Sequence, residues 1–140
     1  MKIYFACSIT GGREFESVYQ AIVSALTVDG HHILTAHLAQ ANAVTDEAHL
    51  TPREVYDRDV SWLRECDALV AEVSVPSHGV GYEIGFVLNE KKPAICLYQE
   101  GRKISKMISG NSDSNLVVRS YKSEQEAVTL ARRSLCEIQS

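Results

Sequence analysis

Short apolar runs alternate with longer amphipathic stretches along this chain, and that alternation constrains the fold more than any other feature. Short apolar runs bounded by turn residues are typical of buried strands, whereas apolar residues spaced three and four apart are typical of helices. Strands that alternate with helices form right-handed βαβ units around a parallel sheet covered on both faces. The sequence therefore predicts a single doubly wound α/β domain, flavodoxin-like or Rossmann-like, with five parallel strands in the order 2-1-3-4-5.

The boundaries of the elements follow from the same pattern and from helix caps. We expect strands over residues 2–7, 32–36, 67–73, 93–98 and 116–121. We expect helices over 14–27, 52–66, 80–90 and 102–109, a final helix after Ser123, and a loop over 41–50. Thr51 with Glu54, and Ser123 with Glu126, have the spacing of capping boxes, which satisfy the free N–H groups where helices begin.

Length and charge exclude several classes of protein. The chain has 140 residues, which fits one core, and we assign residues 1–140 to a single domain. Its formal net charge is -4, and it shows no basic stripe of the kind that binds nucleic acid. No segment approaches the roughly 20 apolar residues that cross a membrane. We therefore expect neither a nucleic-acid partner nor a membrane partner.

The cysteines indicate a reducing compartment. No two of them form a C-x-x-C motif, and three of the four lie in apolar surroundings: Cys7, Cys66, Cys96 and Cys136. We expect buried free thiols rather than a disulfide framework or a zinc site. The first seven residues are too short and wrongly flanked for a signal peptide. These features predict a cytoplasmic protein without a metal or another cofactor.

Ligands of open parallel sheets bind beyond the carboxyl ends of the strands, which here precede the loops at 8–13, 36–38, 74–81 and 99–105. The first loop reads Ser8-Ile9-Thr10-Gly11-Gly12-Arg13, and its small residues allow a ligand close to the backbone. It lacks the Gly-Lys-Ser/Thr ending of a Walker A motif and does not match G-x-G-x-x-G. From these residues alone, a glycine-rich turn and a ligand loop are equally good interpretations.

The stretch over 76–85 places a carboxylate at the ligand end of the sheet. Ser77, Gly79 and Gly81 lie where a loop enters a helix, an arrangement that suits phosphate. In the helix predicted over 80–90, Glu83 lies in the first turn. The helix dipole stabilises a negative charge there, whether or not the side chain has a catalytic role. Glu83 also shares a helical face with apolar residues, and a carboxylate on such a face is more often functional. The sequence thus favours a catalytic Glu83.

Asp59 interrupts the apolar stripe of the helix predicted over 52–66. It lies four residues after Val55 and three before Trp62, so its side chain faces the core. Burial of an unpaired carboxylate costs on the order of several kcal/mol, so a core arginine, a hydroxyl or a substrate must compensate it. We expect the neighbouring Asp57 and Arg58 to be solvated.

Three further residues lie near the ligand end without indicating a role on their own. His37 follows the second strand, and a lone histidine is usually structural or solvated. Ser105 could cap a helix or contact phosphate. Cys7 is a possible nucleophile, but no base stands beside it, so a packing thiol is the better interpretation.

Together these residues resemble the nucleoside 2-deoxyribosyltransferase superfamily, most closely its branch of 2′-deoxynucleoside 5′-monophosphate N-glycosidases, the Rcl-like hydrolases. The resemblance extends over nearly the whole chain. It rests on Ile3-Tyr4-Phe5, Ser8-Ile9, Gly11-Gly12-Arg13, Asp59, Trp62-Leu63, Asp67, Ala71-Glu72-Val73, Pro76-Ser77 and Gly79-Val80-Gly81-Tyr82-Glu83. The last two segments are the most specific.

The resemblance implies a reaction through a covalent glycosyl-enzyme. Glu83 would attack the anomeric carbon of a nucleotide and expel the base, and water would then release deoxyribose 5-phosphate. Tyr4 would orient Glu83, and Asp59 would assist the leaving base or hold the sugar. Ser77 and Gly79 would bind the 5′-phosphate.

The resemblance also implies a homodimer whose active site is completed across the interface. Ser105, with Met107 nearby, would come from the neighbouring subunit. Base and sugar would contact Met107 and the residues Cys7, Ser8, Ile9, Thr10, Gly11, Gly12, Arg13 and His37. Cys7 stands where the branch has Gly, and Thr10 stands where it has Arg. The missing arginine removes a fixed positive charge near the ligand, which leaves the base and the sugar open.

Several functions remain open at this point. The leading one is hydrolysis of the N-glycosidic bond of (2′-deoxy)nucleoside 5′-monophosphates, which Ser77 and Ser105 favour as phosphate ligands. A nucleoside 2-deoxyribosyltransferase, which passes the sugar to a second base, has less need of those serines. A non-catalytic nucleotide-binding module would need the phosphate loop but not Glu83 and Asp59. Flavin binding is weaker, because the first loop lacks a Ser/Thr-rich phosphate signature.

Overall fold

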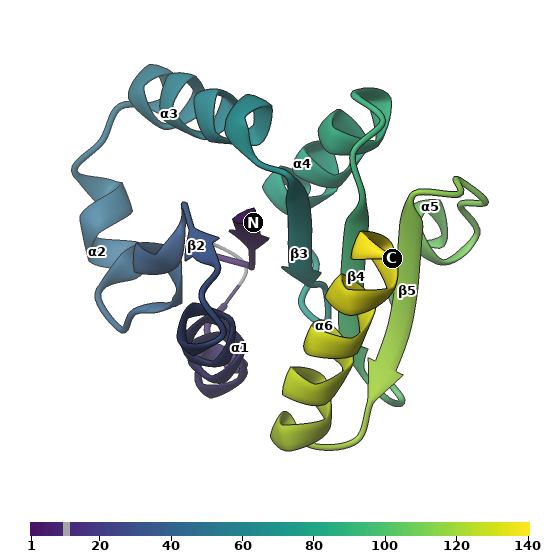
Figure 1. The fold of residues 1–140 in the computed structure, drawn as a ribbon. Helices are drawn as coiled ribbons and strands as arrows, with labels where there is room; N and C mark the ends of the chain where they lie inside the picture. The colour runs from purple at the N-terminus through teal and green to yellow at the C-terminus, as the bar shows by residue number, and fades with distance from the viewer. Residues whose placement is uncertain (10–11) are drawn as a thin grey trace.

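The computed structural model describes residues 1–9 and 12–140, which form a five-stranded sheet flanked by helices (Figure 1). The strands are β1 (Lys2–Ala6), β2 (His32–Ile33), β3 (Ala68–Glu72), β4 (Ala94–Gln99) and β5 (Leu116–Tyr121). The strands pair in parallel, in the order β2-β1-β3-β4-β5. The predicted fold class and strand order are confirmed.

Helices cover both faces of the sheet. They are α1 (Glu16–Val28), the short 3-10 helix η1 (Ala36–Ala39), α2 (Ala43–Ala48), α3 (Pro52–Glu65), α4 (His78–Asn89), α5 (Lys106–Ser109) and α6 (Glu124–Gln139). Helices α1 and α6 pack together against one face, and α3 and α4 cover the other (Figure 1). The sheet is therefore the middle of three layers.

Alternate residues of β1 point to opposite layers, and this places a tyrosine beneath α3 and α4. Ile3 and Phe5 are buried against α1 and α6, while Tyr4 and Ala6 face the α3–α4 layer. The neighbouring β3 is buried along its whole length, as expected of a central strand. The Tyr4 side chain therefore enters the layer that contains α4 and Glu83.

Both predicted N-caps form, but only the first is a complete capping box. At the start of α3, Thr51 Oγ1 accepts a hydrogen bond from Glu54 N at 3.2 Å, and Glu54 Oε2 accepts one from Thr51 N at 2.8 Å. At the start of α6, Ser123 Oγ accepts from Glu126 N at 3.1 Å. The Glu126 carboxylate accepts instead from Lys122 N, so the second motif is not a complete capping box.

The second strand is shorter than predicted. The apolar pattern predicted a strand over 32–36, but β2 has two residues. Thr35 Oγ1 donates to Phe5 O at 2.7 Å and accepts from Phe5 N at 2.8 Å. This side chain takes the backbone groups of β1 that a longer strand would have paired with, and η1 follows directly.

The loop predicted over 41–50 is wrong, because α2 occupies its centre. Among the residues of α2 only Ala43 is buried, so no apolar stripe reveals the helix in the sequence. Glu47 of α2 forms an ion pair with Arg58 of α3 at 2.9 Å, which ties these two consecutive helices together. Helix α4 begins at His78, two residues earlier than predicted, and α5 is confined to 106–109.

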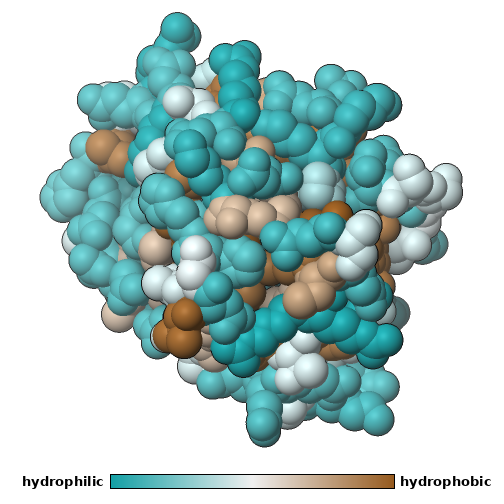
Figure 2. Space-filling model, in the orientation of Figure 1, coloured by the Kyte–Doolittle hydropathy of each residue, from teal (hydrophilic) through white to brown (hydrophobic). Residues whose placement is uncertain are grey.

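The face of the molecule in Figure 2 is largely hydrophilic, with scattered apolar residues. The large apolar side chains exposed on the described part of the chain are Val28, Val44, Tyr56, Tyr82 and Met107. Within residues 1–9 and 12–140, no helix is long and apolar enough to span a bilayer. Three of the four cysteines are buried free thiols, as predicted: Cys7, Cys66 and Cys96.

Candidate active site

A cavity of about 530 Å³ lies at the carboxyl end of β1, lined by residues of α2, α3 and α4. The predicted site residues that line it are Cys7, Ile9, Asp59, Ser77, Gly79 and Glu83. The rest of its wall is mainly apolar and consists of Ala6, Leu38, Leu50, Pro52, Val55, Tyr56, Val60, Leu63 and Tyr82, with Glu47 as a further carboxylate. An apolar cavity with a few convergent polar groups is the usual form of a small-molecule site.

The N-terminus of α4 forms one wall of this cavity. Ser77 is the N-cap, and its Oγ accepts a hydrogen bond from Val80 N at 3.3 Å. This bond uses the serine as an acceptor, so its hydroxyl proton remains available to a ligand. A Cβ placed on Gly79 would lie 3.8 Å from Glu83 Oε1 and 3.9 Å from Ser77 Oγ. Glycine at this position keeps open the space between the hydroxyl and the carboxyl group.

Glu83 lies in the second turn of α4 rather than the first, because the helix begins at His78. The helix dipole acts mainly within the first turn, so it explains this carboxyl group poorly. Burial, the largest cause, raises the pKa of Glu83 to about 7; the Tyr4 hydroxyl opposes the shift and the charge of Asp59 adds to it. A carboxyl group that titrates near neutral pH is suited to catalysis.

The Tyr4 hydroxyl is buried and close enough to Glu83 to lower the pKa of that carboxyl group, but it makes no hydrogen bond of full geometry to any described residue. Burial first, and then the charges of Glu83 and Asp59, raise the pKa of Tyr4 far above its ordinary range. Tyr4 therefore stays protonated and remains a donor. A buried donor without a partner costs free energy, so a nearby carboxylate that accepts from it would be favoured.

Arg58 compensates the charge of Asp59, and the expectation that Arg58 is solvated is wrong. Arg58 Nε lies 2.9 Å from Asp59 Oδ1, and their side chains are 23% and 21% exposed. The guanidinium also lies over the Trp62 ring, 5.0 Å from its centroid. Burial raises the pKa of Asp59, and Arg58 opposes that shift. Asp57, by contrast, is exposed as predicted and pairs with Arg53 on the surface.

Glu47 is a third carboxylate at the cavity. Its side chain is 15% exposed, and Oε1 lies 2.9 Å from Arg58 Nη2 and 3.5 Å from His37 Nε2. The rings of His37 and Trp62 pack with their centroids 5.6 Å apart. The Arg58 guanidinium thus pairs with two carboxylates, Glu47 and Asp59. His37 lies beside Glu47 but does not line the cavity.

The loop after β1 contributes a thiol and an apolar side chain to the cavity. Cys7 and Ile9 line it, and burial raises the pKa of the Cys7 thiol to about 12. The thiol therefore stays protonated at neutral pH and is a poor nucleophile. Ser8 is fully buried and lies outside the lining. The predicted positions Thr10 and Gly11 lie outside the described residues.

Arg13 fastens this loop to neighbouring segments. Its guanidinium donates to the carbonyl oxygens of Ser8 at 3.2 Å and Gln40 at 2.9 Å, and it pairs with Glu16 at 3.2 Å. Gly12 has a φ of 122°, which only glycine adopts without strain. Neither Arg13 nor Gly12 lines the cavity, and the contacts of Arg13 are with the protein backbone and Glu16.

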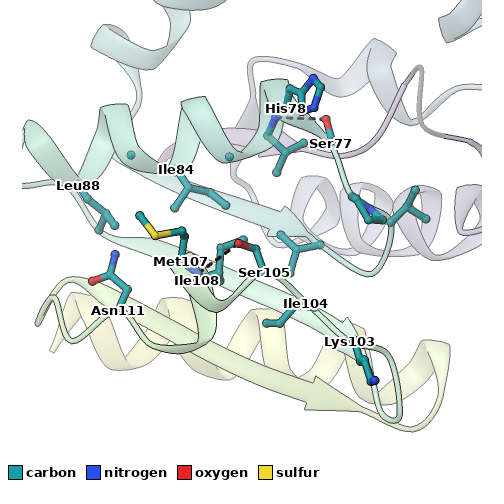
Figure 3. A pocket seen from close by; sticks show the side chains of 16 residues that line it. Ser77, His78, Ile84, Leu88, Lys103, Ile104, Ser105, Met107, Ile108 and Asn111 are labelled. Carbon is teal, nitrogen blue, oxygen red and sulfur yellow. Dashed lines mark hydrogen bonds between the residues drawn. The ribbon is translucent and has the colours of Figure 1, made fainter.

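Ser105 and Met107 lie at a second cavity of about 400 Å³, between α4 and the segment that carries α5 (Figure 3). Ser105 caps α5, since its Oγ accepts from Met107 N at 3.2 Å, and Met107 is 83% exposed. Ser77 lines both cavities. Within one chain, Ser105 therefore lies on the same cavity as Ser77 but not on the one that contains Glu83.

The arrangement suits glycosidic chemistry by carboxyl groups. Retaining glycosidases use one carboxylate as nucleophile and a second carboxyl group as acid, and here Glu83 and Asp59 both have raised pKa values in a mainly apolar cavity. No cluster of three or more His, Cys, Asp or Glu side chains that could hold a metal ion occurs among the described residues.

Arg58 and Glu47 are the residues of the site that sequence reasoning missed. Asp59 on an apolar face implied a partner, but adjacent side chains on a helix normally point in different directions, which argued against Arg58. Glu47 lies in a polar segment without periodicity. No signal in the spacing could have placed it beside Arg58.

Comparisons with known proteins identify relatives. A sequence model of the family described as "Nucleoside 2-deoxyribosyltransferase" matches residues 3–130. A Mus musculus protein named 5-hydroxymethyl-dUMP N-hydrolase is 43% identical over 136 residues, which are 94% of this chain and 78% of that protein. A Methanosarcina mazei protein with the provisional name 2′-deoxynucleoside 5′-phosphate N-hydrolase 1 is 42% identical over 119 residues, covering 85% of this chain and 74% of that one. The solved structure of Clostridium botulinum CMP N-glycosidase has the same fold, with a TM-score of 0.71 at 22% identity, covering 97% of this chain and 99% of that one.

Proposed function

The chain belongs to the nucleoside 2-deoxyribosyltransferase family, and from that membership we propose that it hydrolyses the N-glycosidic bond of (2′-deoxy)nucleoside 5′-monophosphates. The products are the free base and (deoxy)ribose 5-phosphate. The observation that carries this proposal is one cavity lined by Glu83, Asp59 and the N-terminal residues of α4. This cavity combines carboxyl groups suited to glycosidic chemistry with a helix N-terminus suited to binding phosphate. The names of the relatives, which are N-hydrolases of nucleotides, support the same reaction.

Glu83 is the nucleophile in this reaction. Its ionised carboxylate attacks C1′ of the sugar, the bond from C1′ to the base nitrogen breaks, and a covalent glycosyl-enzyme forms. Water then attacks C1′, the ester bond to Glu83 breaks, and the sugar phosphate leaves. The Tyr4 hydroxyl, buried and without another partner, orients the carboxylate by donating to it.

Asp59 assists departure of the base or holds the sugar. The leaving base gains negative charge as the glycosidic bond breaks, so a proton delivered to it lowers the barrier. Burial raises the pKa of Asp59, which makes the protonated form more accessible than in an exposed aspartate. Arg58 fixes the direction of the carboxyl group at 2.9 Å.

The 5′-phosphate binds at the start of α4. This helix has twelve residues, and the unpaired N–H groups of its first turn favour an anion. The Ser77 hydroxyl donates to the phosphate, and Gly79 leaves room for it beside Glu83. The base then occupies the apolar part of the cavity, near Cys7 and Ile9. We also assign contacts with the base and sugar to His37 and to the other residues of the loop over 8–13.

We assign the chain to a homodimer in which each subunit completes the site of the other. Ser105 does not line the cavity of its own chain that contains Glu83, and the Met107 side chain beside it is 83% exposed. Both are therefore available to a neighbouring subunit, Ser105 for phosphate and Met107 for the base or sugar. We further assign residues 1–140 to one catalytic domain that acts in the cytoplasm without a cofactor.

A panel of substrates tests the function. The purified protein is incubated with dNMPs, NMPs and unphosphorylated nucleosides, with and without a second free base, and the products are separated by chromatography. Release of base and sugar phosphate from a monophosphate in water supports the hydrolase. Base exchange confined to unphosphorylated nucleosides identifies a deoxyribosyltransferase instead, and nucleotide binding without turnover identifies a binding module.

Gly79→Ala is expected to weaken the enzyme without weakening the fold. The added methyl group would stand at ordinary contact distance from Glu83 and Ser77, in the space assigned to the sugar phosphate. Alanine in a helix is favoured over glycine by roughly 0.5–1 kcal/mol. We expect KM for a monophosphate to rise about tenfold or more while the melting temperature stays equal or rises. Unchanged KM would place the phosphate elsewhere.

Activity is expected to rise with pH through the pKa of Glu83. The nucleophile must be ionised, and burial raises its pKa to about 7, so kcat/KM should increase from about pH 6 and level off above about pH 8. Phosphate monoesters lose their second proton with a pKa near 6, so the part of the rise above about pH 7 is the part that reports on Glu83. A kcat/KM that falls as pH rises through 7 would make Glu83 the proton donor instead.

A further inference from the structure

Glu72 is a buried carboxylate that the proposed reaction leaves without a role. It is the last residue of β3, and its side chain is 1% exposed. The preceding Ala71 packs in the layer of α4, whereas Tyr121, which contacts Glu72, belongs to the core shared with α1 and α6. Glu72 thus points away from α4 and does not line the cavity that contains Glu83. Its effect on a reaction there must pass through another group.

Three hydrogen bonds converge on the Glu72 carboxylate. Ser74 donates twice, from N to Oε1 at 2.7 Å and from Oγ to Oε2 at 2.8 Å. The Tyr121 hydroxyl also donates to Oε2. Ser74 Oγ in turn accepts a hydrogen bond from Gln99 N at 2.8 Å. Glu72 therefore ties the residues that follow β3 to the carboxyl ends of β4 and β5.

The charge of Glu72 is stabilised by hydrogen bonds rather than by an ion pair. Burial, the largest cause, raises the pKa of Glu72, and the bonds from Tyr121 and Ser74 oppose that shift. All three bonds come from donors, which favours the ionised form because a carboxylate only accepts. Arg102, the basic residue whose charge also favours this form, pairs with Glu14 instead. A buried charge without an ion pair lowers stability, and such groups are typical of functional sites.

We propose that Glu72 is a positioning residue that fixes residues 77–79, the segment to which the 5′-phosphate is assigned. This inference rests on the proposed function. Only two residues separate Ser74 from Ser77, and one of them is Pro76, whose ring fixes φ. The bonds on Ser74 therefore restrict Ser77, which caps α4 (Figure 3). Donors that are already in place bind an anion without the entropy cost of ordering a loop.

The position of Glu83 depends less on Glu72 than that of Ser77 does. Glu83 lies further along α4, and that helix is anchored by buried side chains of its own, at Val80, Ile84, Val87 and Leu88. Loss of the bonds at Glu72 should therefore weaken phosphate binding more than it slows the chemical step.

Glu72→Gln tests this expectation on the monophosphate that the wild-type protein hydrolyses best. Glutamine keeps the shape, but its amide group places a donor against donors of Ser74 or Tyr121. We expect KM to rise about fivefold or more while kcat falls less than about twofold. The Kd for deoxyribose 5-phosphate, measured by calorimetry, should rise by the same factor as KM. A merely structural role lowers the folded fraction and the apparent kcat but not KM, so an unchanged KM overturns the inference.

Asp67→Asn is the matched control. Asp67 precedes β3 at the opposite end of the strand, where its carboxylate also accepts a backbone hydrogen bond, from Lys2 N at 2.7 Å. The same change from carboxylate to amide there should leave KM at the wild-type value. An equal rise of KM in both variants would contradict a specific role for Glu72.

Tyr121→Phe is the second variant, for the case in which Glu72→Gln does not fold. It keeps the buried ring and removes one donor from Glu72, so KM should rise about twofold to threefold, and an unchanged KM overturns the inference equally. If the wild-type protein hydrolyses no nucleotide, the proposed function fails. The inference is then tested by the Kd for deoxyribose 5-phosphate alone. Equal values in wild type and variant, or no binding to either, overturn it.

Discussion

Glu83→Ala is expected to lower kcat by at least about a thousandfold on every monophosphate that the wild-type protein hydrolyses. The variant lacks the carboxylate that we propose as the nucleophile at C1′. The other carboxyl groups of the cavity cannot replace it, because Asp59 and Glu47 are both held by Arg58. Base release under single-turnover conditions measures the chemical step apart from product release.

Glu90→Ala is the matched control for this experiment. Glu90 stands at the opposite end of α4, paired with Lys92 at 3.2 Å, so the same substitution there leaves the cavity intact. Its kcat should equal that of the wild type. A Glu83→Ala variant that retains more than about a tenth of the wild-type kcat would show that another group forms the bond to the sugar.

Glu83→Gln is expected to stabilise the fold by about 3 kcal/mol at pH 8 and to leave it nearly unchanged at pH 4.5. Burial raises the pKa of Glu83 from 4.5 to about 7 in the folded protein. Below the unfolded value the group is protonated in both states and costs nothing. As pH rises from 4.5 to 7, the unfolded chain ionises first, and folding loses stability until both states are ionised. Glutamine stays neutral throughout and removes this loss.

Urea unfolding of wild type and Glu83→Gln at the two pH values measures the effect. The free energy of unfolding should differ between the proteins at pH 8 and converge at pH 4.5, with equal m-values. Glu90→Gln should show no such pH-dependent difference. An equal change at both pH values would indicate altered packing rather than a buried charge. Such a gain is expected where a buried group is retained for function at a cost to stability.

Much of the fold was predictable because it depends on how apolar residues are spaced over short stretches of the sequence. The buried run at 68–72 and the apolar stripes of the helices determine which segments form strands and helices. Parallel strands joined by right-handed crossovers then leave few possible orders. Strand β2 was overestimated because a side chain, Thr35, replaces the backbone pairing of a longer strand. Such a local exchange leaves no trace in the apolar pattern.

Part of the site was also predictable from the local spacing of apolar residues. Asp59 and Glu83 were identified because each places a charge on an apolar helical face, and both line the same cavity. Glu47 and Arg58 were missed because they belong to two different helices, and the sequence between residues 47 and 58 does not indicate that the two side chains meet. The position of Ser105 could not follow from one chain, since its proposed contact lies in a neighbouring subunit.

The configuration of the product formed in dilute methanol tests the covalent mechanism most directly. Methanol competes with water for the glycosyl-enzyme, and NMR distinguishes the anomers of the methyl glycoside 5-phosphate that results. Two displacements at C1′, the first by Glu83, retain the β configuration of the nucleotide, so the β anomer is the predicted product. An α anomer would show a single displacement by solvent and would contradict a covalent intermediate on Glu83.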